Sequence, residues 1–342
     1  MLIFLAALLL LCLWGVDFKP FQSDYLSIRK TTAIKGIFTV LIFLSHAKGY
    51  GDPTLTGDPG VRILSFLGQL VVVMFFFYSG FGIMKQFEKR GDGYVKSFPK
   101  NRILKLLVHF DLAVLFFLIV QTLIGARFPL SHYFYCWIGW QTVGNSNWFV
   151  FDMLVLYLIM YAALSAIVRL LVSKPFALAI LCLLSLSVWL FLHFMKSGET
   201  WWYNSLIAFP LGAIYSQIHA QTDAFHEKRH WAFALSVLLC AMLWIVLRRR
   251  FGVDPYGVSA ALFSLAVIGG SSFFSFDNPI LQWLGKNCFQ IYILQRIPMI
   301  VLSHFRLNVN PYIFISGSLF LTVLLAFGFR WLTGKLDKVL FA

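Results

Sequence analysis

A lysine and a histidine eleven positions apart are the residues of this sequence best placed for chemistry. Lys35 and His46 enclose an apolar run, and Thr39 lies between them. In an α-helix these two positions fall within about 20° of one face and roughly 16 Å apart along the axis. An imidazole deep in a membrane could accept the proton of an acceptor hydroxyl near neutral pH. The alternative is a histidine that is hydrogen-bonded at a helix end only for packing.

A second group of candidate residues is basic and follows the third apolar run. Its members have helical or near-helical spacing and are Lys96, Lys100, Arg102 and Lys105. Such a cluster could bind the phosphates of a ligand. An excess of lysine and arginine is also expected in any cytoplasmic loop. The cluster therefore predicts either a phosphate-binding site or only the orientation of the chain.

Other polar residues inside the apolar runs are weaker candidates. Ser79 could act as a nucleophile, but the Ser79-Gly80 pair is more simply explained by close packing of helices. Asp152 could orient His46, although nothing in the sequence brings the two together. Tryptophans gather near expected outer helix ends, where either an aromatic belt or stacking on sugar rings would explain them. They are Trp137, Trp140, Trp148, Trp201 and Trp202.

The runs that carry these residues predict helices that span a membrane. The chain is 60% hydrophobic and 12% charged, about half the charged share of a soluble domain, and its mean hydropathy is +0.80. The runs do not alternate at period two, so a β-barrel is not expected. We predict an all-α polytopic transmembrane bundle of about eleven spans. The spans are expected at residues 2–16, 34–49, 62–84, 101–124, 147–172, 175–195, 200–219, 231–249, 257–274, 286–305 and 311–333.

The distribution of lysine and arginine among the loops predicts the orientation. The loops after the first and third spans are rich in both, and Lys335 and Lys338 follow the last span. We therefore expect an outer N-terminus and a cytoplasmic C-terminus. The triplet Arg248-Arg249-Arg250 would then lie outside, against the rule. Either the spans are miscounted there, or the triplet binds an anionic group of an acceptor or of lipid headgroups.

Cysteine usage and the N-terminal run exclude several other classes. The five cysteines are scattered without a CxxC pair or a His/Cys cluster, so we predict neither a disulfide scaffold nor a metal site. The first run lacks a basic start and a small-residue cleavage site, so we interpret it as a retained helix. A net charge of +14 would suggest nucleic acid in a soluble protein, but basic cytoplasmic loops explain it here.

Six short motifs recur along the chain in the order of a known family. They are Lys35-Gly-Ile with His46, Phe75–Phe81, Arg102–Lys105, Asn147–Phe149 with Tyr157, Phe209–Gly212, and Leu284–Tyr292. This series resembles the acyltransferase-3 family of membrane acyltransferases, which has ten helices. By that resemblance, residues 1–25 would be an additional N-terminal transmembrane helix and residues 26–342 the acyltransferase domain.

The resemblance also implies an activity. The family transfers an acyl group, commonly acetyl, from cytoplasmic acyl-CoA to a hydroxyl of a glycan or glycolipid, without a metal. His46 would be the general base, and Lys35, Lys100, Arg102 and Lys105 would bind the donor. Ser79, Trp148, Asp152 and Tyr157 would support them, and Arg248, Arg249 and Arg250 would be acceptor-binding candidates. The expected enzyme is thus an O-acetyltransferase of the cell membrane.

Three departures from the family pattern and one rival class complete the prediction. Lys35 stands where arginine is usual and cannot make the bidentate contact of a guanidinium. Asn101 and Val108 replace a basic residue and a proline, and Gln295 replaces a histidine.

The rival is a transporter or flippase for a glycan or lipid. Such proteins often carry matched repeats with broken helices, and we find no internal repeat in this sequence.

Overall fold

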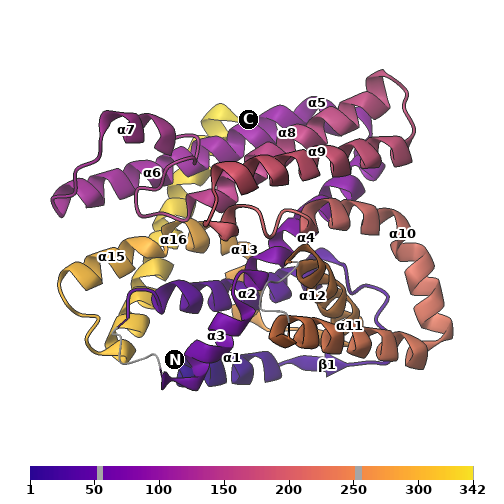
Figure 1. The fold of residues 1–342 in the computed structure, drawn as a ribbon, viewed down its shortest axis with the longest axis horizontal. Coiled ribbons are helices and arrows are strands. Elements are labelled where there is room, and N and C mark those ends of the chain that lie inside the picture. Colours follow the sequence, from indigo (N-terminus) through magenta and orange to yellow (C-terminus); the bar gives the residue numbers. More distant parts are fainter. Residues whose placement is uncertain (52–56, 251–255, 342) are drawn as a thin grey trace.

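The computed structural model describes residues 1–51, 57–250 and 256–341, without the side chains of residues 248–250 and 256. The described chain is mostly helical (Figure 1). Its elements are α1 (Leu2–Leu13), β1 (Val16–Phe18), α2 (Ile28–Ala47), α3 (Pro59–Leu67), α4 (Leu70–Arg90), α5 (Asp92–Phe98), a π-helix (Pro99–Leu104), α6 (Lys105–Leu123), α7 (Leu130–Cys136), α8 (Asn147–Arg169), α9 (Lys174–Met195), a 3₁₀ turn (Thr200–Trp202), α10 (Ala208–Lys228), α11 (His230–Arg250), α12 (Tyr256–Ser271), β2 (Phe274–Phe276), α13 (Pro279–Lys286), α14 (Cys288–Leu294), α15 (Arg296–His304) and α16 (Pro311–Leu340).

Six helical stretches in the described chain are long and apolar enough to cross a membrane. They are Pro59–Arg90, Asp92–Leu123, Asn147–Arg169, Lys174–Met195, His230–Leu247 and Pro311–Leu340. Each overlaps one of the predicted spans, so the all-helical membrane class is confirmed. The other predicted spans coincide with helices that are shorter or more polar, such as α1 with 12 residues and α12 with 16. The predicted number of eleven spans therefore lacks the same support.

Two predicted spans contain an irregular turn, and both irregularities lie close to candidate residues. The helix from Asp92 to Leu123 passes through the π-helix Pro99–Leu104, which contains Arg102. Short π-helical segments frequently occur at functional sites. The predicted span 286–305 is divided at Gln295 into α14 and α15. Pro298 explains the division, because it has no N–H to donate to the carbonyl four residues earlier.

Glycines allow two pairs of helices to cross with their backbones in contact. A Cβ atom on Gly80 of α4 would lie 2.1 Å from the Phe209 carbonyl oxygen, and one on Gly212 of α10 would lie 2.0 Å from the Phe77 oxygen. At the crossing of α2 and α13, a Cβ on Gly285 would lie 1.8 Å from the Thr32 oxygen. Small residues favour such close crossings in membranes. The packing interpretation of Ser79-Gly80 is therefore confirmed for Gly80.

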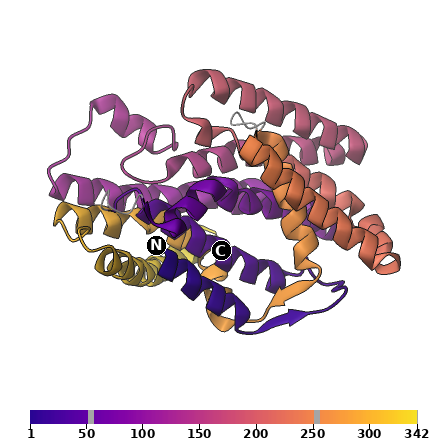
Figure 2. The ribbon, with the colours of Figure 1, turned by 60° about the horizontal axis from the view of Figure 1, so that its bottom comes forward.

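The N-terminal segment is joined to the rest of the bundle by a short antiparallel pair of strands. β1 and β2 lie side by side, with Val16 opposite Phe276 (Figure 2). The guanidinium of Arg29 donates to both carboxylate oxygens of Asp277, at 2.6 and 2.7 Å. Residues 1–25 are therefore in direct contact with the later part of the chain.

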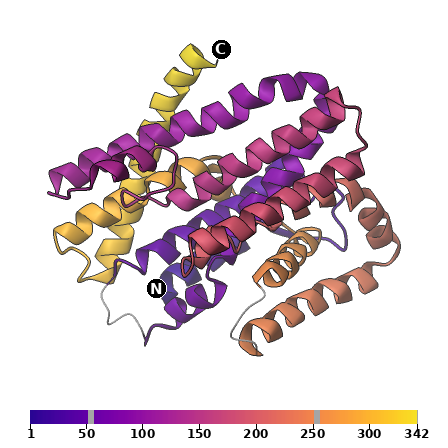
Figure 3. The same ribbon diagram turned by 45° about the horizontal axis from the view of Figure 1, so that its top comes forward.

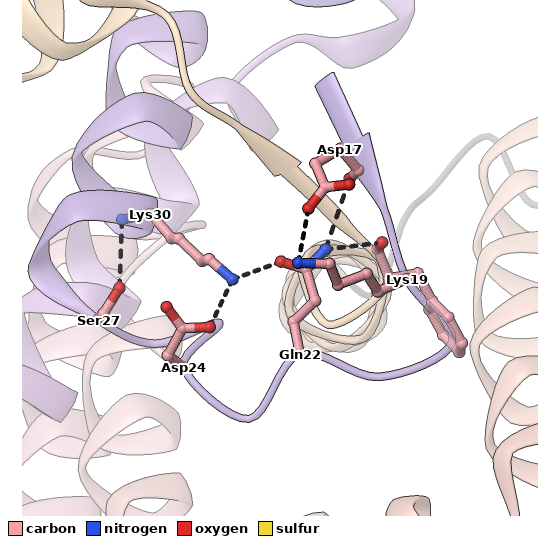
Figure 4. A network of polar contacts seen from close by, with 7 residues as sticks. Asp17, Lys19, Gln22, Asp24, Ser27 and Lys30 are labelled. Atoms are coloured by element: carbon pink, nitrogen blue, oxygen red, sulfur yellow. Dashed lines mark hydrogen bonds and ion pairs between the residues drawn. The ribbon is translucent and has the colours of Figure 1, made fainter. Parts of the chain in front are cut away.

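The turn that leads from β1 into α2 is held by a polar network (Figure 4). The ammonium of Lys30 donates to the Gln22 side chain and, at 2.5 Å, to Asp24. The hydrogen bond from Lys30 holds the pKa of Asp24 below its usual value. Ser27 accepts a bond from the Lys30 backbone N–H and so caps the start of α2.

Two segments lie at the edge of the bundle. α11 and α12 pack against each other on one side, and the C-terminal end of α16 projects beyond the other helices (Figure 3). Only 6% of the apolar part of α11 is buried, so most of this helix is not covered by the rest of the described chain. The Arg248–Arg250 triplet ends this helix, but its side chains lie outside the described residues.

Candidate active site

His46 lies at the C-terminal end of α2, which runs without a break from Ile28 to Ala47. Lys35 and His46 thus belong to one helix, as predicted. The imidazole is half-buried; its Nε2 atom lies 3.5 Å from the Ser146 hydroxyl, and its ring centroid lies 6.2 Å from that of Tyr292. Its Nδ1 atom is buried and has no hydrogen-bond partner among the described residues. One ring nitrogen is therefore free of protein partners.

The loop before α8 presents Ser146 to the imidazole. Asn145 holds the loop, because its side-chain oxygen accepts hydrogen bonds from the Val143 N–H at 3.1 Å and from the Thr142 hydroxyl at 3.2 Å. The Tyr292 hydroxyl on α14 donates to the Ser146 carbonyl oxygen at 3.2 Å. α2, the loop and α14 thus meet at His46.

A cationic side chain, Arg296, completes this end of the site. It lies at the start of α15, close enough for its charge to act on the His46 ring. Its Nη1 atom donates to the Asn145 carbonyl oxygen at 3.3 Å, and its Nε atom donates to the Tyr50 hydroxyl at 3.1 Å. Sequence reasoning missed this residue.

A cavity of about 160 Å³ begins beside this polar cluster. Ile42 lies one turn before His46 on α2, and Tyr292 also forms part of the wall. Toward the opposite end the wall includes Thr39, Tyr157 and Cys288. Most of the remaining lining is apolar, and it consists of Val72, Phe75, Ser79, Leu106, Phe149, Met153 and Phe289. The space could accept an apolar group more readily than a charged one.

Two of the four predicted donor residues, Lys35 and Arg102, lie near the part of the cavity wall formed by Cys288 and Tyr157. Lys35 lies near Cys288, and Arg102 lies beside the hydroxyls of Tyr94 and Tyr157. Because Cys288 and Tyr157 line the cavity, both basic residues approach its wall.

The other two predicted donor residues have protein partners. Lys105 is paired with Asp337 at 2.6 Å, and Asp337 also contacts His109 at 2.9 Å. Lys100 is exposed and has an interaction of its own within the described chain. A carboxylate thus neutralises Lys105, whereas the partners of Arg102 are hydroxyl groups.

The predicted supporting residues also differ in how close they lie to the cavity. The hydroxyls of Ser79 and Tyr157 share a hydrogen bond of 3.1 Å at its wall. Asp152 is buried, and its Oδ1 atom has no partner in the described chain, but no hydrogen bond joins it to His46. Trp148 is half-buried and packs edge-on against Phe149. The proposed orientation of His46 by Asp152 thus gains no contact to support it.

Sequence reasoning missed Ser146 and Arg296, and it placed Tyr292 in a family motif without giving it a role in the site. Arg296 carried a usable signal, because an ionisable residue inside an apolar span requires a functional or structural reason. Ser146 carried none, since it lies in a loop without periodicity, one hundred positions after His46.

The described chain is thus a bundle with six helical stretches long and apolar enough to cross a membrane, and it contains a mostly apolar cavity. Residues 30–331 match the family model described as an acyltransferase domain, which covers most of the chain. The chain therefore belongs to the acyltransferase-3 family, as its motifs predicted. No curated protein and no solved structure matched it.

Proposed function

We propose that this acyltransferase moves an acetyl group from cytoplasmic acetyl-CoA to a hydroxyl of an envelope or extracellular glycan or glycolipid. The observation that carries the proposal is one cavity whose wall includes Tyr157 and Cys288, the neighbours of Arg102 and Lys35, and also Tyr292, the neighbour of His46. Basic groups suit the phosphates of coenzyme A, and an apolar passage suits its acyl thioester end. The enzyme would lie in the cell membrane with an outer N-terminus and a cytoplasmic C-terminus.

In the proposed reaction His46 is the general base. The free imidazole nitrogen removes the proton from the acceptor hydroxyl as the hydroxyl oxygen attacks the thioester carbonyl carbon. The new C–O bond forms, the C–S bond breaks, and coenzyme A leaves as a thiolate. The imidazolium returns its proton to that thiolate. No charge accumulates on the protein over one cycle.

The direct test of the function is product analysis with purified protein in lipid nanodiscs. Acetyl-CoA would be supplied with a panel of acceptors that includes octyl glucoside and octyl glucuronide, a neutral and an anionic glycolipid probe, and envelope polysaccharides. We expect release of free coenzyme A together with an acetyl ester on the acceptor, detected by mass spectrometry. Movement of a glycolipid across the bilayer without any ester product would instead favour the transporter or flippase.

Charge reversal at Arg102 tests the donor end. Arg102→Glu should raise the KM for acetyl-CoA about tenfold or more, because a charge-assisted contact contributes about 1.5–3 kcal/mol. It should also weaken the salt dependence of KM. Lys89→Glu, an exposed charge reversal at the end of α4, is the matched control and should leave KM unchanged. If the wild type, Arg102→Glu and Lys89→Glu have equal KM values, the basic cluster serves only to orient the chain in the membrane.

Enlarging the cavity tests the choice of acetyl as the transferred group. Met153 lines the cavity, so Met153→Ala should shift the ratio of kcat/KM for butyryl-CoA over acetyl-CoA upward by about tenfold or more, because each methylene in an apolar pocket is worth about 1–3 kcal/mol. Met160→Ala removes a buried methionine from the same helix outside the lining and is the control. An unchanged ratio in Met153→Ala would show that the donor does not occupy this cavity.

A further inference from the structure

Arg296 carries a charge that the described protein does not neutralise. Its hydrogen-bond partners are a carbonyl oxygen of Asn145 and the hydroxyl of Tyr50, both neutral, and the Tyr50 ring lies 5.5 Å from its guanidinium. None of the ion pairs within residues 1–51, 57–250 and 256–341 includes Arg296. A half-buried guanidinium without a carboxylate is costly in a membrane protein. Within the described residues, Arg296 is therefore a cation beside His46 that can meet a negative charge on a substrate or a transition state.

The location of Arg296 shows which counter-charge this could be. Arg296 follows Tyr292 by about one helical turn, and it shares the Asn145–Ser146 segment with His46. The hydroxyl proton of Tyr292 is already donated to the Ser146 carbonyl. Lys35 lies eleven residues from His46 on α2, roughly 16 Å along the helix. Of these three groups, Arg296 is the cationic donor that can lie beside the reacting atoms.

Acyl transfer creates a negative charge at this place in every turnover. When the acceptor oxygen attacks the thioester, the carbonyl electron pair moves onto its oxygen, and it returns when the C–S bond breaks. Fixed donors that face the developing oxyanion lower the barrier, and loss of one such donor typically reduces kcat by about a hundredfold to a thousandfold. A guanidinium offers several N–H groups in one plane.

We propose that Arg296 is a catalytic residue that stabilises the oxyanion of the tetrahedral intermediate, opposite the base His46. The assignment rests on the proposed acyl transfer. In this role the positive charge of Arg296 acts on the oxyanion and does not require a charged acceptor. Neutral and anionic acceptors should therefore depend on Arg296 equally.

The test compares steady-state kinetics of Arg296 variants with acetyl-CoA and whichever of octyl glucoside, octyl glucuronide or an envelope polysaccharide the wild-type enzyme acetylates. Arg296→Gln should lower kcat by about a hundredfold to a thousandfold and leave both KM values unchanged. Arg296→Lys keeps the charge but loses the planar donors, so its kcat should be intermediate. Arg306→Gln, an exposed arginine beyond α15, should behave as wild type.

Three outcomes would overturn the assignment. One is a wild-type kcat in Arg296→Gln or, if that variant does not fold, in Arg296→Lys. Another is a raised acceptor KM with unchanged kcat, limited to anionic acceptors, which would make Arg296 an acceptor-binding residue. The third is an equal loss of kcat in Tyr50→Phe, which removes the hydroxyl that accepts from Arg296 and would indicate a structural role. Absence of acyl transfer by the wild-type enzyme would instead contradict the proposed function itself.

Discussion

His46→Ala is expected to lower the kcat of acyl transfer by about a hundredfold to ten-thousandfold, the usual contribution of a general base. In the described chain the imidazole has one hydrogen-bond contact, at 3.5 Å to Ser146, and it is half-buried, so its removal should cost the fold little. The variant should therefore insert into membranes and bind acetyl-CoA normally. The measurement is kcat in nanodiscs, with membrane yield and thermal unfolding as checks on folding.

His193→Ala is the matched control for this experiment. His193 is exposed near the end of α9 and stacks on Trp189 at a centroid distance of 5.1 Å, away from the cavity lining. Its replacement should leave kcat unchanged. Turnover by His46→Ala at the wild-type rate would remove the proposed base, whatever the control shows.

Gly80→Ala is expected to destabilise the fold. The added methyl group would lie 2.1 Å from the Phe209 carbonyl oxygen, and because that atom belongs to the backbone of α10, the two helices must separate. Overpacking of this kind costs about 1–3 kcal/mol or more. We expect a lower unfolding temperature and a reduced yield of monodisperse protein in detergent.

Gly82→Ala provides a control on the same helix two residues later. A Cβ atom there would have no neighbour within 4 Å, and alanine favours the helix by about 1 kcal/mol over glycine. This variant should be as stable as the wild type or slightly more stable. If both variants unfold at the same temperature, the crossing of α4 and α10 is not as close as described.

The long apolar helices could be predicted from the sequence because length and apolarity alone decide them. The runs predicted at 147–172 and 175–195 end within a few residues of α8 and α9. The interruption at Gln295 was not predicted, although Pro298 three residues later gave the reason for it. The length of α1 was overestimated because the apolar run continues past Leu13, where the chain turns toward β1.

The candidate site could be predicted only in part. Lys35 and His46 share one helix, so their spacing alone placed them on one stripe. Ser146 and Arg296 reach the imidazole through contacts between segments more than ninety positions apart, which no local pattern encodes. The ion pair of Lys105 with Asp337 is likewise a long-range contact, and it makes Lys105 a weaker candidate for binding the donor.

The pairing of β1 with β2 also has a consequence for the order of events during synthesis. Val16 leaves the ribosome early, but its partner Phe276 follows 260 residues later (276 − 16). At about 5–20 residues per second, the N-terminal segment waits roughly tens of seconds before its partner strand emerges. During that interval α1 can be retained only by the lipid and by the first helices that follow it. We therefore expect residues 1–18 to be the last part of the early chain to become protected from protease in a ribosome-stalled membrane preparation.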